Sequence, residues 1–281
     1  MSFFNLILFD KNNNMNILVI HDNSIVGKNI HEIIENKKDK NNWLYINFIE
    51  LTILELEAYF INFTPNIVIY IFGTDLNNSN IFDLILITTC VKFNLEYLII
   101  FCNTPTSLVK NFKKFNLSIK YLCLFGKYIY GNYGKFIKTE NEINRLIYNI
   151  FITKRENKIL KINSDYKIKD KYIYVNDIIN ILYFITTEKL SIIENKIIDI
   201  CQYEFNYNIK ELVNLILKAF SINLKIEYFS KINTPVFLTE KDNRNNKKNK
   251  ASIIQDFNYI PIDQSIINTV KWFLDNYPNI E

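Results

Sequence analysis

The sequence has few cysteines and no long apolar run, and each shortage excludes a class of protein. None of its four cysteines forms a close pair, which excludes a zinc ribbon and a Cys-x-x-Cys redox motif, so we expect buried free thiols and no metal site. No stretch reaches the ~18 uninterrupted apolar residues of a membrane span. The first ten residues, MSFFNLILFD, lack the basic segment and cleavage site of a signal peptide. We therefore expect a soluble, cytoplasmic protein without a membrane partner.

Glycine, proline and tryptophan are also rare, whereas Lys, Asn, Ile, Tyr and Phe dominate. These abundant residues share A/T-rich codons, so the bias carries little functional information. Hydrophobic residues make up 49% and charged residues 22% of the 281 residues, as in globular proteins. The net charge of +4 is small, and the basic stretch 241–250 has no aromatic residue that could stack on bases. We expect no nucleic-acid partner.

Strand-like and helix-like stretches alternate through the first half of the chain. Short runs rich in β-branched residues predict strands at 16–20, 43–47, 66–72 and 95–102, and periodic stretches predict helices at 25–35, 53–63 and 79–93. This alternation is typical of an α/β protein with a Rossmann-like, doubly wound parallel sheet. The predicted core includes Ile17, Val19, Ile67, Ile69, Leu98 and Ile100.

The second half is less regular and predicts a smaller C-terminal substrate lobe. A helix is expected at 139–154, with Thr139 as its N-cap and Glu142 as its capping-box residue. The remaining expected elements are a strand, turn and helix within 171–187, a helix at 208–220 capped by Asn208, a strand at 225–230 and a last helix at 263–277. We expect residues 15–130 and a return segment at 171–202 to form the first domain, and 131–170 and 203–281 the second lobe.

Several segments, in order, resemble one family over about residues 15 to 280. They include NILVIHDNSIVGKNIHEII, LCLFGKYIYGNYGKF, KYIYVNDIINI and DFNYIPIDQSIINTVKWFLDNY. These segments are similar to the extended short-chain dehydrogenase/reductases, or NAD-dependent epimerase/dehydratases, that act on nucleotide sugars. Within that family they resemble the GDP-L-fucose synthases most. The resemblance implies NADP as cofactor and a GDP-linked sugar as small-molecule partner.

The turn after the first predicted strand departs from the family pattern. The family's Gly-x-x-Gly-x-x-Gly falls on His21, Ser24 and Gly27, so only the glycine needed for close helix–strand packing is kept. A Ser24 side chain stands where the family binds pyrophosphate, and we expect weak NADP binding. The cofactor-binding positions that the resemblance implies are His21, Asn23, Ser24, Ile25, Val26, Gly27 and Gly73.

The family's Tyr-x-x-x-Lys pair is missing from the sequence. None of the 18 tyrosines has a lysine four residues later. The stretch 103–120 is too short, by roughly 30 residues, for the loop and helix that carry this pair. A missing coding segment would shorten the stretch in the same way. Because family members dimerise through this region, we expect either a rearranged homodimer around the helix at 79–93 or poor solubility.

Other family positions are also substituted. Cys102 and Thr104 occupy the positions of the family's Ser and Cys, and Glu142 that of its catalytic His. Lys169 and Asp170 fall at a substrate-binding Arg. Two hypotheses stay open. The chain is an NADPH-dependent enzyme that epimerises and reduces GDP-4-keto-6-deoxymannose to GDP-L-fucose, or it is an inactive paralogue that binds a nucleotide or a protein.

Overall fold

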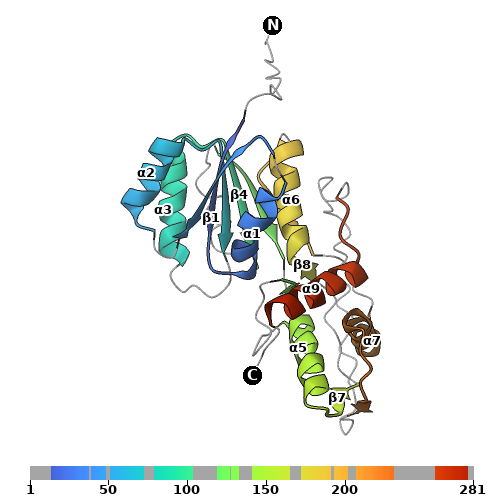
Figure 1. Cartoon of the computed structure of the whole chain (residues 1–281). Helices are drawn as coiled ribbons and strands as arrows, with labels where there is room; N and C mark the ends of the chain where they lie inside the picture. The colour runs from blue at the N-terminus through green and yellow to red at the C-terminus, as the bar shows by residue number, and fades with distance from the viewer. Residues whose placement is uncertain are drawn as a thin grey trace, which may run out of the picture.

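A computed structural model provides the fold and the side-chain contacts (Figure 1). It describes residues 14–37, 39–48, 51–72, 79–103, 119–126, 128–132, 141–164, 172–190, 193–201, 207–230 and 257–277. None of the described helices reaches the length and apolarity that a membrane crossing requires.

Five strands from the first half of the chain and one from the second half form a parallel six-stranded sheet in the order β2-β1-β3-β4-β5-β9. Its strands are β1 (Asn16–His21), β2 (Asn42–Asn47), β3 (Ile67–Phe72), β4 (Tyr97–Cys102), β5 (Lys120–Phe125) and β9 (Lys196–Asp199). Every neighbouring pair runs parallel, as the alternation of strands and helices predicts. The Rossmann-like, doubly wound arrangement is confirmed, and the four strands predicted in the first half are within two residues of their predicted ends.

Helices cover both faces of this sheet (Figure 1). On one face lie α1 (Ile25–Glu35) and α6 (Val175–Glu188), and on the other α2 (Ile53–Phe63) and α3 (Ser79–Lys92). Alternate residues of a strand point to opposite faces, so Val19 packs in the cluster with α1 and α6, whereas Leu18 packs with α2 and α3. All six predicted core residues are fully buried, which confirms the two-sided core.

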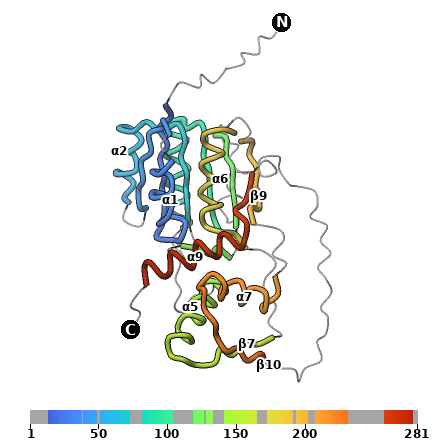
Figure 2. The backbone as a smooth tube through the Cα atoms, turned by 45° about the vertical axis from the view of Figure 1, so that its right-hand side comes forward, coloured from blue at the N-terminus to red at the C-terminus, as the bar shows by residue number. Residues whose placement is uncertain are grey.

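The second half contributes a smaller group of elements below the sheet (Figure 2). They are α5 (Glu142–Arg155), β7 (Leu160–Asn163), α7 (Ile209–Phe220), β10 (Ile226–Phe229) and α9 (Ile262–Asn276). β7 pairs with β10 in a parallel ribbon, and β6 (Ile129–Tyr130) pairs with β8 (Ile173–Tyr174). The exact boundaries of the two predicted domains stay a prediction. Asn208 caps α7 as predicted, with Glu211 completing a capping box.

One predicted helix start and one predicted turn are wrong. Helix α5 begins at Glu142, and its N-cap is Asn141, whose side chain accepts the backbone N–H of Asn144. Asparagine is among the strongest N-cap residues, so it sets the helix start later than predicted, and Glu142 is no capping-box residue. Thr139 lies outside the described residues. Helix α6 follows β8 with no intervening turn, because Tyr174 is both the last strand residue and the N-cap.

Candidate functional site

The turn between β1 and α1 is tied to its own side chains. The backbone N–H of Asp22 donates to the carbonyl of Ile71 at 3.2 Å, which fixes the turn at the carboxyl end of β3. The Asp22 carboxylate accepts the backbone N–H of Ser24 at 2.9 Å, and the Ser24 hydroxyl caps α1 by accepting the N–H of Gly27 at 3.3 Å. Asp22 is 6% exposed. Short side chains therefore satisfy backbone donors that a glycine turn leaves to a ligand.

Gly27 performs the packing role expected from the sequence. A Cβ atom at this position would lie 2.1 Å from the carbonyl oxygen of Asp22 and 3.0 Å from Nδ1 of His21. Only glycine allows α1 to approach the end of β1 this closely. The His21 ring lies over the same turn, with Nδ1 3.0 Å from the Asp22 carbonyl oxygen. The predicted positions from His21 to Gly27 thus span the end of β1, the turn that follows it and the first residues of α1.

This turn does not fit the pyrophosphate of a dinucleotide. A bound pyrophosphate needs free backbone N–H groups and close approach to the backbone. Here the N–H groups of Ser24 and Gly27 have side-chain acceptors, and the Asp22 carboxylate adds a negative charge beside them. At the end of β2, where a dinucleotide's ribose would be recognised, the Asn47 amide donates to the Asn23 side chain at 3.1 Å.

Asp22 and Asn47 were not among the predicted site residues. An aspartate two residues before a helix-capping serine is a turn signal, so Asp22 could have been found from the sequence. Asn47 gave no such signal, because its contact with Asn23 joins residues that are 24 positions apart.

Two buried cysteines lie side by side at the carboxyl end of β4. Cys102 is 1% exposed, and its Sγ lies 3.9 Å from Sγ of Cys123 on the adjacent strand β5. All four cysteines are buried free thiols, as predicted. Cys102 is therefore positioned in the core, away from any solvent-accessible reacting group. Gly73, Thr104, Lys169 and Asp170 lie outside the described residues.

Glu142 is held by a tyrosine 30 residues further along the chain. It is the first residue of α5, and its carboxylate accepts a hydrogen bond from the hydroxyl of Tyr172, next to β8. Negative charge at this end of a helix is favourable because it faces the positive end of the helix dipole. The pair places a carboxylate and a phenol together at the edge of a pocket.

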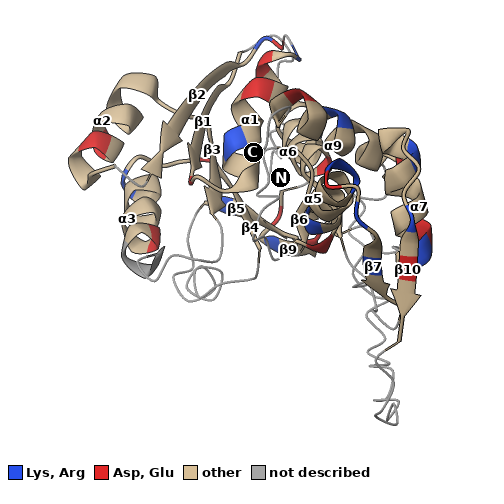
Figure 3. Cartoon of the chain, turned by 60° about the horizontal axis from the view of Figure 1, so that its bottom comes forward, with Lys and Arg blue, Asp and Glu red and all other residues tan. Residues whose placement is uncertain are grey.

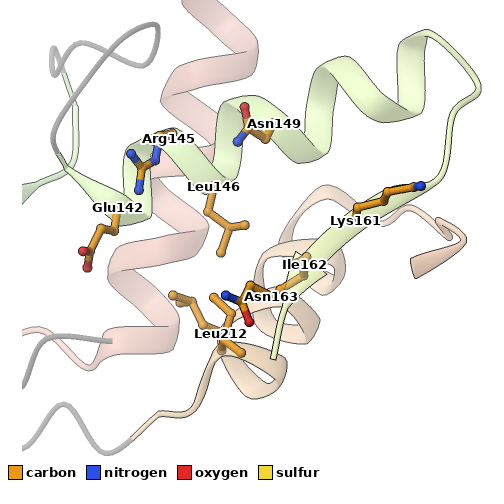
Figure 4. A pocket seen from close by; sticks show the side chains of 9 residues that line it. Glu142, Arg145, Leu146, Asn149, Lys161, Ile162, Asn163 and Leu212 are labelled. Atoms are coloured by element: carbon orange, nitrogen blue, oxygen red, sulfur yellow. The ribbon is translucent and has the colours of Figure 1, made fainter. Parts of the chain in front are cut away.

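This pocket lies between α5, β7 and α7 and has a volume of about 160 Å³. Its apolar lining comes from Leu146, Ile162, Ile209 and Leu212, and its polar lining from Glu142, Arg145, Asn149, Lys161 and Asn163. Figure 4 shows Leu146, Asn163 and Leu212 pointing toward one another, with Arg145 and Glu142 on the first turns of α5. An apolar floor with a few polar groups is typical of a small-molecule site.

The charges around this pocket are mixed. Figure 3 shows basic and acidic residues interspersed over α7, β7 and β10. Lys161 lies 3.7 Å from Glu227 across the β7–β10 ribbon, and both side chains are exposed. Among the described residues no carboxylate pairs with the exposed side chain of Arg145.

Two further carboxyl groups are buried near the sheet. Burial raises the pKa of Asp83 to about 6, although its bond from the Tyr70 hydroxyl opposes the shift. Burial raises the pKa of Asp177 to about 7, and the bond that it accepts from the Ile260 N–H opposes this. Within the described parts of the chain, no three His, Cys, Asp or Glu side chains are grouped so that they could hold a metal ion.

No protein-family model and no curated protein matches the sequence. Solved structures do match. A GDP-L-fucose synthetase from Naegleria fowleri superposes with a TM-score of 0.70 at 14% identity, over 95% of this chain and 94% of that one, and a second structure of that enzyme is bound to NADP.

Two other solved structures match over similar lengths. A GDP-mannoheptose C4 reductase from Campylobacter jejuni, with NADP bound, superposes with a TM-score of 0.61 at 14% identity, over 92% of this chain and 98% of that one. A UDP-glucose 4-epimerase from Thermus thermophilus, in complex with NAD, superposes with a TM-score of 0.59 at 10% identity, also over 92% of this chain and 98% of that one. At these identities the likeness establishes a shared fold.

Proposed function

We propose that this chain is a relative of the nucleotide-sugar epimerases and reductases that has lost hydride-transfer chemistry. In this proposal it binds a phosphorylated sugar or sugar nucleotide in the pocket between α5, β7 and α7. The shared fold supports the relationship. The observation that carries the binding function is the Arg145 guanidinium, which lines the pocket without a carboxylate partner among the described residues.

Two features support the loss of chemistry. The sequence has no Tyr-x-x-x-Lys pair, and a positioned acid–base group typically contributes ~10²–10⁴-fold to rate. The turn after β1 does not fit the pyrophosphate, so we expect weak NADPH binding, with a dissociation constant above the micromolar range. The Glu142–Tyr172 pair does not replace the missing pair, because a carboxylate beside a phenol disfavours the phenolate, whereas the lysine of the missing pair would favour it.

The size of the pocket narrows the ligand class. Sites that enclose a whole drug-sized ligand typically measure about 300–1,000 Å³. A pocket of about 160 Å³ holds one part of a sugar nucleotide, such as a phosphorylated sugar or the base. Because the solved structures with this fold include enzymes named for GDP-linked sugars, we propose GDP-linked sugars as the first ligands to test.

Calorimetric titration of GDP, GDP-mannose and mannose 1-phosphate tests the binding function. Arg145→Ala should weaken binding by roughly 10–100-fold, the value of a lost hydrogen bond to a charged group. Arg155→Ala is the matched control, since it removes the same charge from the exposed last turn of the same helix. Equal losses in both variants, or no binding of any of these ligands, would refute the proposed site.

The alternative is an active NADPH-dependent GDP-L-fucose synthase. The retained Gly27 packing favours it, because close helix–strand approach is the part of a dinucleotide turn that this chain keeps. NADPH and the keto-sugar nucleotide should be offered to the full chain, with product followed by chromatography. We expect no turnover; robust formation of a reduced sugar nucleotide would establish the enzyme instead.

A further inference from the structure

Asp22 is the first residue of the turn between β1 and α1. Its backbone N–H is bonded to β3, and its side chain turns back to accept the N–H of Ser24 at 2.9 Å. The residue is almost fully buried, at 6% exposure. Burial and Asp83 raise the pKa of the Tyr70 phenol in β3. The charge of Asp22 adds to this rise to a smaller degree, so its field extends into the sheet. A carboxylate is thus built into the start of this helix.

A phosphate bound at a helix N-terminus uses the same interactions that Asp22 makes. It accepts backbone N–H groups of the turn, and the helix dipole stabilises its negative charge. The first turn of α1 contains no acidic residue, so Asp22, two residues before the N-cap, is the carboxylate that faces the dipole. The Ser24 N–H already donates to the Asp22 carboxylate, and the Gly27 N–H donates to the Ser24 hydroxyl.

We propose that Asp22 is an internal anion that takes the hydrogen bond and the electrostatic position of a bound phosphate. The turn therefore excludes phosphates by charge, in a fold whose other geometry, including the Gly27 packing, still suits them. The inference concerns the first domain and does not depend on the ligand of the pocket between α5, β7 and α7.

A steric explanation makes a different prediction. If the His21 ring or the Ser24 side chain blocked the turn, neutralising Asp22 would change nothing. Asp22→Asn separates the two explanations, because asparagine keeps the side-chain oxygen that accepts the Ser24 N–H and nearly the same volume. The substitution removes the negative charge and keeps this hydrogen bond.

The test uses inorganic pyrophosphate as the probe and the full chain as the protein. Backbone amide chemical shifts of Ser24 and Gly27 are followed by NMR, so that pyrophosphate bound near Arg145 is recorded separately. We expect no saturable shift at the turn in the unmodified chain, and at least tenfold tighter binding there in Asp22→Asn. Asp263→Asn, which removes a charge from the exposed first turn of α9, should leave the turn unchanged.

Two outcomes would overturn the proposal. One is saturable binding at Ser24 and Gly27 in the unmodified chain with the same affinity as in Asp22→Asn. The other is a folded Asp22→Asn chain whose turn still binds no pyrophosphate. If that variant does not fold, Asp22→Ser provides the same comparison, since serine is neutral and also accepts a hydrogen bond in a turn of this kind. Loss of pocket binding in Arg145→Ala has no bearing on either result.

Discussion

The turn between β1 and α1 differs from the pocket between α5, β7 and α7 in where its hydrogen bonds go. In the turn, the N–H groups of Ser24 and Gly27 are bonded to neighbouring side chains, and a buried carboxylate supplies the negative charge. In the pocket, the Arg145 guanidinium and an apolar floor face a cavity. Solved structures of the same fold have a dinucleotide bound, whereas in this chain the pocket that we propose for a ligand lies between α5, β7 and α7.

This difference shows that one fold can keep its architecture while its sites change separately. The apolar core and the close packing at Gly27 belong to the architecture, and they are intact. The polar residues of the turn belong to the site, and they satisfy one another. Function therefore has to be argued from each site in turn, because the fold alone prescribes none.

Gly27→Ala should have the largest effect, because it tests the packing that the turn retains. The added Cβ would meet the Asp22 carbonyl oxygen at 2.1 Å, and that backbone is fixed by its bond to β3. We expect a loss of more than about 3 kcal/mol in the free energy of unfolding. Gly126→Ala is the control, since its Cβ would meet a side-chain atom of Ile173 at 3.1 Å and not a backbone atom. Similar losses in urea denaturation of both variants would contradict this account.

Asp177 extends the comparison to α6, the helix that packs beside α1. Its Oδ2 has no hydrogen-bond partner among the described residues, in contrast to the partnered Asp22 carboxylate. Its folded-state pKa of about 7 lies above the ordinary value, so the folded state keeps a proton that the unfolded state loses. The stability that this group contributes is fully present below about pH 4 and is lost as the pH rises through 7.

We therefore expect the free energy of unfolding of the unmodified chain to fall by about 3 kcal/mol, relative to that of Asp177→Asn, between pH 4 and 7. Asparagine keeps the acceptor for the Ile260 N–H, so the difference reports the proton. Asp83→Asn is the parallel control. The stability difference between this variant and the unmodified chain should change with pH only up to about pH 6. Denaturation curves that stay parallel from pH 4 to 7 would show that Asp177 titrates normally.

Tyr172→Phe sharpens the pocket side of the comparison. It removes the hydroxyl that donates to the Glu142 carboxylate, so we expect a loss of about 1.5 kcal/mol in stability. Tyr128→Phe is the control, because that ring contacts Tyr172 but is 37% exposed. If the two variants are equally stable in thermal unfolding, the Glu142–Tyr172 bond contributes nothing to the fold.

Ser24→Ala should have the smallest effect and tests which residue closes the turn. Loss of the N-cap that accepts the Gly27 N–H should cost about 1 kcal/mol. Thr52→Ala, at the cap of α2, should cost a similar amount. Because Asp22 stays in place, Ser24→Ala should still exclude pyrophosphate. Tight pyrophosphate binding in this variant would assign the closure to serine.

Local patterns predicted the fold well and the sites only in part. The strand at Asn16–His21 and the helices at Ile25–Glu35 and Ile53–Phe63 follow the expected boundaries closely, since β-branched runs and helical periodicity record which faces are buried. The start of α5 was wrong because Asn141 competes with the predicted cap. Most of the implied NADP-binding positions lie at the junction of β1 and α1, and their role in binding stays a prediction; Asp22, the residue on which our inference about this turn depends, was not among them.

The sequence by itself determined the parallel sheet, its two-sided core, the need for glycine at position 27 and the absence of a Tyr-x-x-x-Lys pair, because these depend on residue order and local periodicity. Only the tertiary structure decided which donors the Asp22 carboxylate satisfies, that Tyr172 reaches Glu142 from 30 residues away, and that Arg145 lines a cavity with residues from β7 and α7. The physical reason is distance along the chain: burial repeats with the local helix or strand period, whereas a contact between side chains of separate elements depends on how the whole core packs.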